Sequence, residues 1–417
     1  MVKKRCATAI GAVILLALAG CSASQGGGGE TTELTVWTQT EEGPELEYTE
    51  RVIAAFEDEN PGVTVNLEQR STDGHKDAIR RVAGTSAGPD VFFYWTGPGL
   101  GKSLVDVGLS QDLTQYYEEY DWDERFTSAA LAGVTQYGGY HGVPNDQQAM
   151  ALYYNKDLFE QAGIDSTPTS YNELIQAADA LVEADITPIA VGGTVNWHAM
   201  RILDSLVETQ CGAETHMQLA ALEASWAEED CVGDAYSEFK AWGDDYFNDG
   251  YLGIDNTGAS QLFFSGQAAM ILEGPWLVEQ AETGGMDLDD IGIFPFPTET
   301  GRLSAFGDAL YISSESENKD LAAKYIDFVT SEEVQEEMGA TPDVIPVNKN
   351  VDPETDNPLN AEWVQIADEA EGVFTPTDSN LPLAITTEYW RVQNSVLTGD
   401  IAPEDAGDAL QSFIDNQ

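Results

Sequence analysis

The chain has 417 residues, of which 42% are hydrophobic and 10% aromatic, so it is long enough for more than one packed core. Its 73 Asp and Glu residues against 18 Lys and Arg give a formal net charge of −55, which disfavours nucleic acid and anionic membrane surfaces as partners. The acids are spread along the whole chain. We therefore interpret the charge as a property of the surface, suited to salty or acidic surroundings, and not as evidence of a cationic ligand.

The chain begins with a segment that is typical of secretion. A basic head, "KKR", precedes an uncharged run over residues 7–19, which is too short to span a membrane and matches a signal peptide. The run ends in "LAGC", which resembles the lipobox of bacterial lipoproteins. This resemblance implies that residues 1–20 are removed, that Cys21 is lipidated, and that residues 21–30 form a lipidated, Gly-rich flexible tether. The alternative is an ordinary cleaved signal in which Cys21 has no role.

The first hundred residues of the body alternate strand and helix. Strands are predicted over residues 34–37, over 63–67 and from Val91, with helices over 44–59 and 78–82. Strands separated by helices predict a parallel sheet with right-handed crossovers, hence an α/β fold. Ligands of such sheets bind beyond the carboxyl ends of the strands, where Trp37 and Trp95 fall.

The same alternation restarts after about Gln147, which indicates a second lobe. Residues 140–143 can form a hairpin edge, and residues 149–154 an apolar strand. A helix follows over 156–162, and Thr169 or Ser170 is the predicted N-cap of the next, with Glu173 completing a capping box. Further strands are predicted in "ITPIAVGG", in "AAMILE" ending at Glu273, in "IGIFPFP" and in "GDALYIS", and further helices over 200–251, 318–339 and most of 360–417.

Two cysteines, Cys211 and Cys231, remain in the body after the signal. Two thiols twenty positions apart in an exported chain predict one disulfide. The four histidines are scattered, so we expect no metal site. No Gly-rich phosphate loop, GxSxG elbow or paired-His motif occurs, and we expect no cofactor.

Six stretches carry a resemblance to a known family. They are "FEDENPGVTV", "GPDVFFYW", "VPNDQQAMALYYNKDLFEQAGI", "FFSGQAAMILEGPW", "GIFPFP" and "ALYISSESENKDLAAKYIDFVTSEEVQ". Their order resembles that of the family 1 extracellular solute-binding proteins, the maltose-binding-protein-like receptors of bacterial ABC importers. The resemblance implies a two-lobed periplasmic-binding-protein-like (type II) α/β fold, with discontinuous lobes joined by hinge strands and a solute held between them.

The resemblance also implies lobe boundaries and partners. We expect lobe 1 over residues 31–146 plus 274–331 and lobe 2 over 147–270 plus 332–417, with hinge crossings near 147–151, near 270–273 and after 331. The expected protein is a monomer on the outer face of the cell membrane, anchored through Cys21. It would bind a carbohydrate and pass it to the permease subunits of an ABC importer.

Sugar binding in this family uses aromatic platforms and polar rims, because a sugar's C–H face stacks on a ring while its hydroxyls need hydrogen-bond partners. Placed on this chain, the predicted platforms are Trp37, Trp95, Trp197, Trp276 and Trp390. The predicted hydroxyl acceptors are Glu41, Asp146 and Asp308, although the loop "TEEGP" around Glu41 lacks the lysine that the closest sugar receptors carry there. The competing interpretation is core packing for the indoles and simple solvation for the acids.

Other functions remain open from the residues alone. A non-sugar solute, such as a polyamine, a glycerophosphoryl compound or a peptide, would fit the same fold. Phosphate-bearing cargo is disfavoured because the predicted cleft loops carry few basic residues, although Arg70, Arg81 and Arg201 have no assigned place. A secreted glycoside hydrolase, with two acids about 5 or 6.5–9.5 Å apart, and a structural surface lipoprotein are further alternatives. We expect no enzyme.

Overall fold

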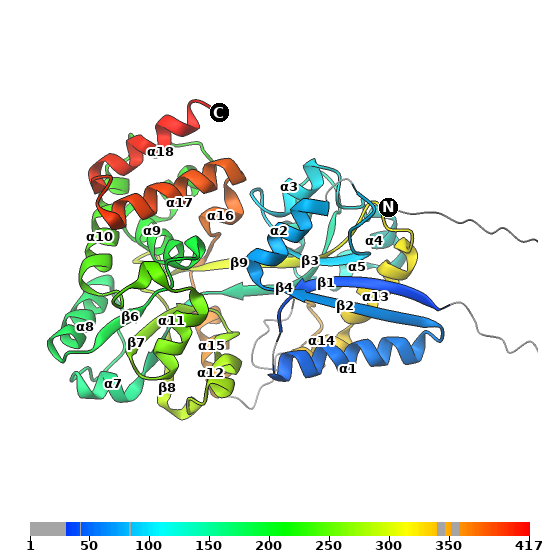
Figure 1. Cartoon of the computed structure of the whole chain (residues 1–417), viewed down its shortest axis with the longest axis horizontal. Helices are drawn as coiled ribbons and strands as arrows, with labels where there is room; N and C mark the ends of the chain where they lie inside the picture. Colours follow the sequence, from blue (N-terminus) through cyan, green and yellow to red (C-terminus); the bar gives the residue numbers. More distant parts are fainter. Residues whose placement is uncertain (1–30, 42, 83–84, 340–346, 352–357) are drawn as a thin grey trace, which may run out of the picture.

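The structure is a computed structural model that describes residues 31–41, 43–82, 85–339, 347–351 and 358–417. These residues form two lobes side by side, each built on its own sheet (Figure 1). The predicted signal peptide, Cys21 and the tether lie outside the described residues. In the part of the chain that is described, no helix has the length and apolar character needed to cross a membrane.

The first lobe contains a sheet of order β10-β9-β3-β1-β2, with β4 paired to β9. β1 runs parallel to both β2 and β3, which confirms the predicted parallel sheet, whereas β9 runs antiparallel to β3. Leu34 and Val36 alternate with more exposed residues along β1 and are buried against the helices. The strands are β1 (Thr32–Gln39), β2 (Val63–Arg70), β3 (Val91–Trp95), β4 (Gly142–Ala149) and β9 (Arg302–Ile312), with β10 (Gly372–Phe374) paired to residues 302–304 at the second-lobe end of β9. The helices are α1 (Gly43–Glu59), α2 (Thr72–Val82), α3 (Gly101–Asp106), α4 (Thr114–Tyr120), α5 (Trp122–Arg125), α6 (Ser128–Thr135), α13 (Lys319–Val329) and α14 (Glu332–Gly339).

The second lobe contains a sheet of order β6-β7-β5-β8. Its strand β7, "AAMILE", is buried throughout and lies between β5 and β6. The N-cap of α8 is Ser170, whose hydroxyl accepts from Glu173 N, and Glu173 in turn accepts from Thr169 N, so the predicted capping interaction is confirmed. The strands are β5 (Ala151–Asn155), β6 (Thr187–Ala190), β7 (Ala268–Glu273) and β8 (Ile291–Phe294). The helices are α7 (Lys156–Gln161), α8 (Tyr171–Glu183), α9 (Asn196–Ala220), α10 (Asp230–Asp245), α11 (Asn256–Phe264), α12 (Leu277–Gly284), α15 (Pro358–Glu369), α16 (Thr377–Asn380), α17 (Leu383–Thr398) and α18 (Ala406–Ile414), with short 3-10 turns at Tyr251–Gly253, Leu288–Asp290 and Pro403–Asp405.

Strands β4 and β9 connect the lobes as one antiparallel pair (Figure 1). Val143 and Leu310, towards one end of the pair, belong to the core of the first lobe. Ala149 and Leu303, towards the other end, belong to a core of the second lobe. The pair overlaps the predicted crossing near 147–151, whereas the expected hairpin edge at 140–143 is wrong, since β4 pairs with β9 far along the chain.

The predicted lobe boundaries are wrong in two further places. Residues 274–301 belong to the second lobe, because β8 pairs with β5 there, and β7 does not cross between lobes at 270–273. Strand β9 carries the chain from the second lobe back to the first. Helix α14, predicted in the second lobe, packs in the first, where Tyr48 of α1 donates from its hydroxyl to the Val334 carbonyl. The Val347 carbonyl still accepts from Thr127 N in the first lobe, whereas Leu359 and Trp363 of α15 pack in a core of the second.

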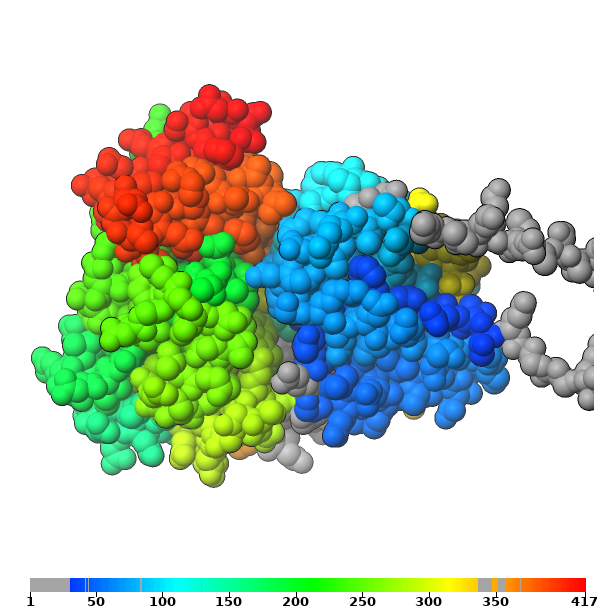
Figure 2. Space-filling model, viewed as in Figure 1, coloured from blue at the N-terminus to red at the C-terminus, as the bar shows by residue number. Residues whose placement is uncertain are grey.

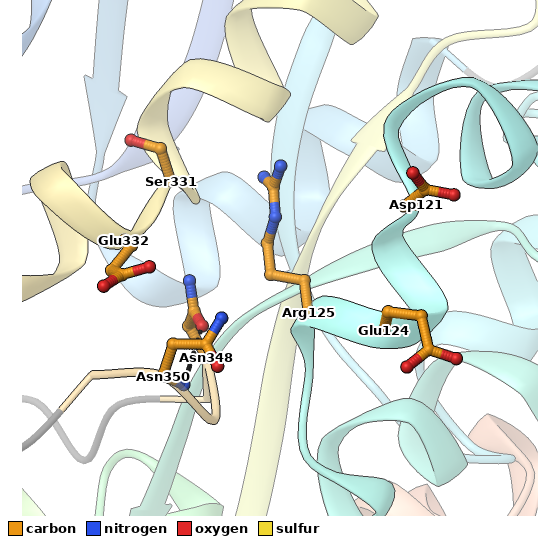
Figure 3. A pocket seen from close by; sticks show the side chains of 7 residues that line it. All are labelled: Asp121, Glu124, Arg125, Ser331, Glu332, Asn348 and Asn350. Carbon is orange, nitrogen blue, oxygen red and sulfur yellow. Dashed lines mark hydrogen bonds between the residues drawn. The ribbon is translucent and has the colours of Figure 1, made fainter.

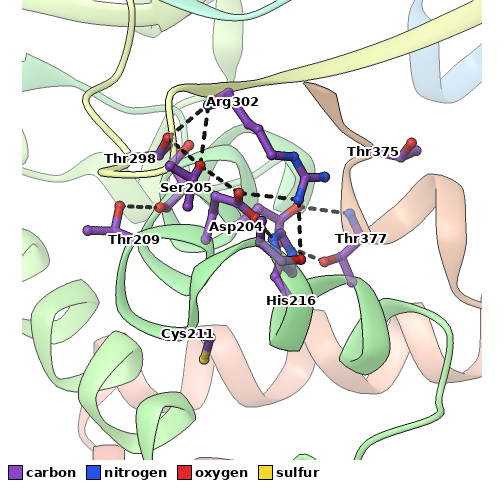
Figure 4. A network of polar contacts seen from close by, with 12 residues as sticks. Asp204, Ser205, Thr209, Cys211, His216, Thr298, Arg302, Thr375 and Thr377 are labelled. Carbon is purple, nitrogen blue, oxygen red and sulfur yellow. Dashed lines mark hydrogen bonds and ion pairs between the residues drawn. The ribbon is translucent and has the colours of Figure 1, made fainter. Parts of the chain in front are cut away.

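A buried polar network fastens α9 to the start of β9 (Figure 4). Glu208, in α9, accepts from Thr300 Oγ1 at 2.7 Å and pairs with His216 Nδ1 at 2.6 Å and Arg302 Nη1 at 3.4 Å. Between Glu208 and His216 the helix kinks at Gly212, whose φ of 75° favours glycine. The predicted disulfide between Cys211 and Cys231 is present beside this kink and joins α9 to α10.

Replacing both Cys211 and Cys231 by Ala is expected to lower the free energy of unfolding of the second lobe by about 3 kcal/mol, since the bond closes a loop with a sequence separation of 20. Urea denaturation followed by tryptophan fluorescence measures the change. Dithiothreitol should produce the same loss in the unchanged protein and none in the variant. An unchanged urea midpoint would show that the bond does not limit stability.

Candidate functional site

Two of the predicted indoles meet around one arginine. Trp197 lies in the first turn of α9, and Trp276 follows β7 at the start of α12. The guanidinium carbon of Arg201, one turn after Trp197, lies 4.5 Å from the Trp197 ring centroid and 5.4 Å from that of Trp276. A guanidinium at these distances is attracted by the faces of both rings. The structure therefore brings Trp197 and Trp276 together, and Phe306 of the crossing strand β9 lies 6.3 Å from Trp276.

The arginine is held by a carboxylate at the end of β7. Glu273 is 2% exposed and accepts from Arg201 Nη1 at 2.6 Å. His198 Nδ1 accepts from Gly192 N, so its Nε2 carries the proton and donates to Glu273 at 3.1 Å. Burial alone would raise the pKa of Glu273, but the Arg201 charge and the bond from His198 lower it to about 2. The cation between the two indoles is thus neutralised and fixed in place.

Two more indoles of the first lobe carry cations on their faces. Arg70 lies with its guanidinium carbon 3.9 Å from the Trp37 ring centroid and pairs with Glu68 at 2.6 Å. The ammonium of Lys76, in α2, lies 4.4 Å from the centroid of Trp95 and 3.9 Å from Asp378 Oδ2 of α16. Because Trp37 and Trp95 are themselves buried, the faces occupied by these cations are not free platforms in this arrangement.

Predicted acids lie together on the crossing strands. Asp146 of β4 and Asp308 of β9 are cross-strand neighbours, and Asp308 also stands opposite Trp95 of β3. Both carboxyls are buried, at 5% and 3% exposure. Burial raises the pKa of Asp146 to about 7, against bonds from Gln148 and Gln147 N, and burial followed by the Asp146 charge raises that of Asp308 well above its usual range. Glu41, after β1, is half-buried, and burial raises its pKa to about 7.

The remaining predicted platform, Trp390, contacts α9 within one turn of Trp197 and next to Arg201. It sits on α17, and its indole Nε1 donates to Met200 Sδ at 3.2 Å, on a part of α9 that packs in the core of the second lobe. Among the described aromatic contacts it shares none with another predicted platform. Residues that the sequence did not assign to the site are Lys76, Arg201, Glu273 and Asp378, and Arg70 now has a place beside Trp37. Arg81 has none at these indoles: its Nε donates to the Asp77 carbonyl on the exposed side of α2.

The lobes touch at the site. Glu45 N of α1 donates to Glu279 Oε1 of α12 at 2.8 Å, and Gly99 N donates to the Ser379 carbonyl at 2.8 Å. A Cβ at Gly99 would lie 2.1 Å from the Leu381 carbonyl oxygen, so the close approach requires glycine. On the face shown in Figure 2, the blue surface of the first lobe meets the green and orange surface of the second. The two lobes are therefore in direct contact beside the site.

A separate cavity of about 290 Å³ lies in the first lobe, away from the indoles (Figure 3). Its central cation, Arg125, donates to Asp327 and Thr330 and is thereby satisfied within the fold. None of the described residues that line the cavity is aromatic, and so they offer no stacking surface; they are Asp121, Glu124, Arg125, Ser331, Glu332, Asn348 and Asn350. In the described part of the chain, no group of three or more His, Cys, Asp and Glu side chains is arranged to hold a metal ion.

Comparisons with known proteins agree with this architecture. The family described as "Bacterial extracellular solute-binding protein" matches residues 41–336. A galactooligosaccharide-binding protein of Bacillus subtilis is 25% identical over 426 residues, covering 98% of this chain and 96% of its own length. A xylose/arabinose-binding protein of Haloferax volcanii is 24% identical over 316 residues, 72% of this chain and 66% of its own. The solved structure of a chitin oligosaccharide binding protein, 23% identical, superposes with a TM-score of 0.85 over 93% of this chain and 99% of its own, which shows the shared fold.

Replacing Asp146 by Asn is expected to stabilise the fold increasingly as pH rises from about 4 to about 7. Burial raises the pKa of Asp146 from 3.8 to about 7, so the folded protein keeps a proton that the unfolded chain has lost, and folding grows less favourable across that window. Asn has no proton to lose. The difference in free energy of unfolding, measured with urea at several pH values, should grow in the variant's favour and level off above pH 7. Asp58→Asn, at an exposed site on α1, is the control, and a difference that does not vary with pH would contradict the assignment.

Proposed function

The chain belongs to the family of bacterial extracellular solute-binding proteins, and we propose that it captures a sugar or oligosaccharide between its two lobes. Binding would stabilise the closed arrangement to the extent that the ligand fits it better than the open one. The membrane permease of an ABC importer would then accept the cargo from the closed lobes. No bond of the cargo is made or broken in this role.

The observation that carries the proposal is the pair of indoles Trp197 and Trp276 around the fixed Arg201, at the surface where the lobes meet. Indoles rigidly held beside charged hydrogen-bonding groups suit a ligand with apolar C–H faces and many hydroxyls. The names of these two relatives support the same class, since they describe proteins that bind galactooligosaccharides and xylose or arabinose. Asp146 and Asp308 would contribute hydroxyl partners from the crossing strands.

The buried acids favour binding over hydrolysis. A glycoside hydrolase needs one carboxyl protonated and its partner ionised. Here Asp146 and Asp308 lie side by side on paired strands and are almost fully buried, so they do not flank a bond from two sides as the two acids of a hydrolase do. We therefore assign these acids to ligand contact and to the crossing of the lobes. An assay for reducing sugar released from oligosaccharides would detect the rival activity.

Maltose, xylobiose, N,N′-diacetylchitobiose and galactose form the test panel, with putrescine, glycerophosphocholine and a dipeptide as non-sugar probes. At least one sugar is expected to raise the melting temperature of the unchanged protein and alter its tryptophan fluorescence, while the non-sugar probes do neither. If only a non-sugar probe acts, or none does, the sugar assignment is wrong.

Trp276→Ala is expected to weaken the binding of the active sugar by a factor of about 30, because loss of a central aromatic contact costs at least ~2 kcal/mol. Isothermal titration calorimetry measures the affinity. Tyr120→Ala removes a half-buried aromatic side chain that stacks on Trp122 in the first lobe, and this control should leave the affinity unchanged. Equal losses in both variants would argue against a platform at Trp276.

Anchoring through Cys21 completes the proposal, with the lipid holding a monomeric receptor at the outer face of the membrane. Two or more acyl chains on the cysteine would give stable attachment. The Cys21→Ala variant is expected to leave the membrane fraction and to lack the added lipid mass, as cell fractionation and mass spectrometry would record. A variant that remains with the membrane would require another anchor.

A further inference from the structure

Lys76 is a buried cation whose donors are unused. It lies in α2 and is 8% exposed, with its ammonium over the face of Trp95. The nearest carboxylate oxygen, Asp378 Oδ2, is 3.9 Å away, beyond hydrogen-bond distance. Among the described residues, Nζ donates no hydrogen bond. An ammonium has three N–H donors, so this group can donate to an acceptor that the described residues do not supply.

Asp378 faces this lysine from the other lobe. It is 9% exposed and lies on α16, which is fastened to α9 where Thr377 donates from both N and Oγ1 to Asp204, each at 2.8 Å (Figure 4). Its Oδ1 accepts a long bond from Ser379 Oγ at 3.4 Å. No described residue donates a hydrogen bond to Oδ2. One side of the pair therefore moves with the first lobe and the other with the second.

The segment that carries Asp378 already touches the first lobe. Gly99 N of the first lobe donates to the Ser379 carbonyl, next to Asp378. The position of a Cβ on Gly99 lies 2.6 Å from the Asp378 carbonyl oxygen, so the two segments are in contact. With the lobes in this contact, the charged atoms of Lys76 and Asp378 still lie 3.9 Å apart. A hydroxyl oxygen placed about 2.8 Å from each charged atom spans such a gap.

We propose that a hydroxyl of the bound sugar fills this gap, accepting from Lys76 Nζ and donating to Asp378 Oδ2. The inference rests on the proposed function and makes Lys76 and Asp378 ligand-contacting residues that bridge the lobes. A hydroxyl both donates and accepts, as the pair requires. A uronate carboxylate at this position would lie against Asp378, and the ammonium of an amino sugar against Lys76. The ligand is therefore uncharged here, and Trp95 serves to hold the lysine.

The burial of Lys76 agrees with this role. Desolvation lowers the pKa of its ammonium, and the charge of Asp378 opposes that shift. The carboxylate from the other lobe thus favours the charged form of the lysine.

The test measures affinities by calorimetry for Lys76→Met and Asp378→Asn, using the panel sugars above and the monodeoxy derivatives of whichever sugar binds the unchanged protein. Each variant is expected to weaken binding by roughly 10- to 100-fold, the range for a hydrogen bond to a charged group. Removal of one particular hydroxyl from the sugar should weaken its binding to the unchanged protein by a similar factor. Lys76→Met should bind that deoxy sugar as tightly as it binds the complete sugar. The matching uronic acid and amino sugar should bind more weakly than the neutral sugar.

The matched control is the exposed pair Lys102 and Asp106 of α3, whose variants Lys102→Met and Asp106→Asn should bind normally. Circular dichroism and melting temperature establish that each variant folds, and Asp378→Asn, which keeps the side-chain size, remains informative if Lys76→Met does not fold.

An affinity within twofold of normal in either folded variant would overturn the inference and would indicate that water, not a sugar hydroxyl, lies between the two side chains. Equal deoxy penalties in Lys76→Met and the unchanged protein would also overturn it, since a structural role weakens all sugars alike. Failure of every panel sugar to bind the unchanged protein would instead overturn the proposed function, and this inference with it.

Discussion

The antiparallel pairing of β4 with β9 is the contact on which the rest of the molecule depends. These strands contribute residues to the cores of both lobes, so their register sets how the two sheets face each other. The same register places Asp146 beside Asp308, and the pairing of β9 with β3 places Asp308 opposite Trp95. Two like carboxyls in a low-dielectric crossing cannot both ionise cheaply. The electrostatics at the base of the site are therefore a consequence of how the lobes are joined.

Three of the few cationic side chains of the protein lie on the faces of tryptophan rings. Only 18 of 417 residues are Lys or Arg, yet Arg70, Lys76 and Arg201 each lie on the face of a tryptophan and beside a carboxylate. The indole faces offset part of the cost of desolvating each cation, and the carboxylate removes its net charge. The indoles are in turn held in one orientation before a ligand arrives, which reduces the entropy lost on binding. Fixed, neutralised pairs of this kind favour uncharged ligands over ions.

Local patterns predicted much of the fold. Alternating apolar residues gave β1 and β2, a buried apolar run gave β7, and the Thr169–Glu173 stretch marked the start of α8. The motifs around Trp197 and Trp276 placed two indoles that the structure brings together. The partner of β4 could not be read in this way, because it lies more than a hundred residues away, and the lobe boundaries failed with it. Lys76 and Arg201 were also missed, since in "DGHKDAIRR" and "NWHAMRIL" a charged residue on a helix looks the same whether it faces water or the other lobe.

The overall negative charge of the chain and the local charge at the site are different quantities with different physical causes. A net charge of −55 creates a field around the whole molecule, which salt screens over about 10 Å at 0.1 M. At the site, burial raises the pKa values of Glu41 and Asp146 to about 7, and the buried cations are matched by Asp378 and Glu273. The local charge is therefore far smaller than the overall charge suggests. Buried pairs are also screened little by salt, so a change of ionic strength would act on the surface and leave the contacts between ligand and indoles largely as they are. A strongly acidic surface is therefore compatible with a site that binds an uncharged ligand.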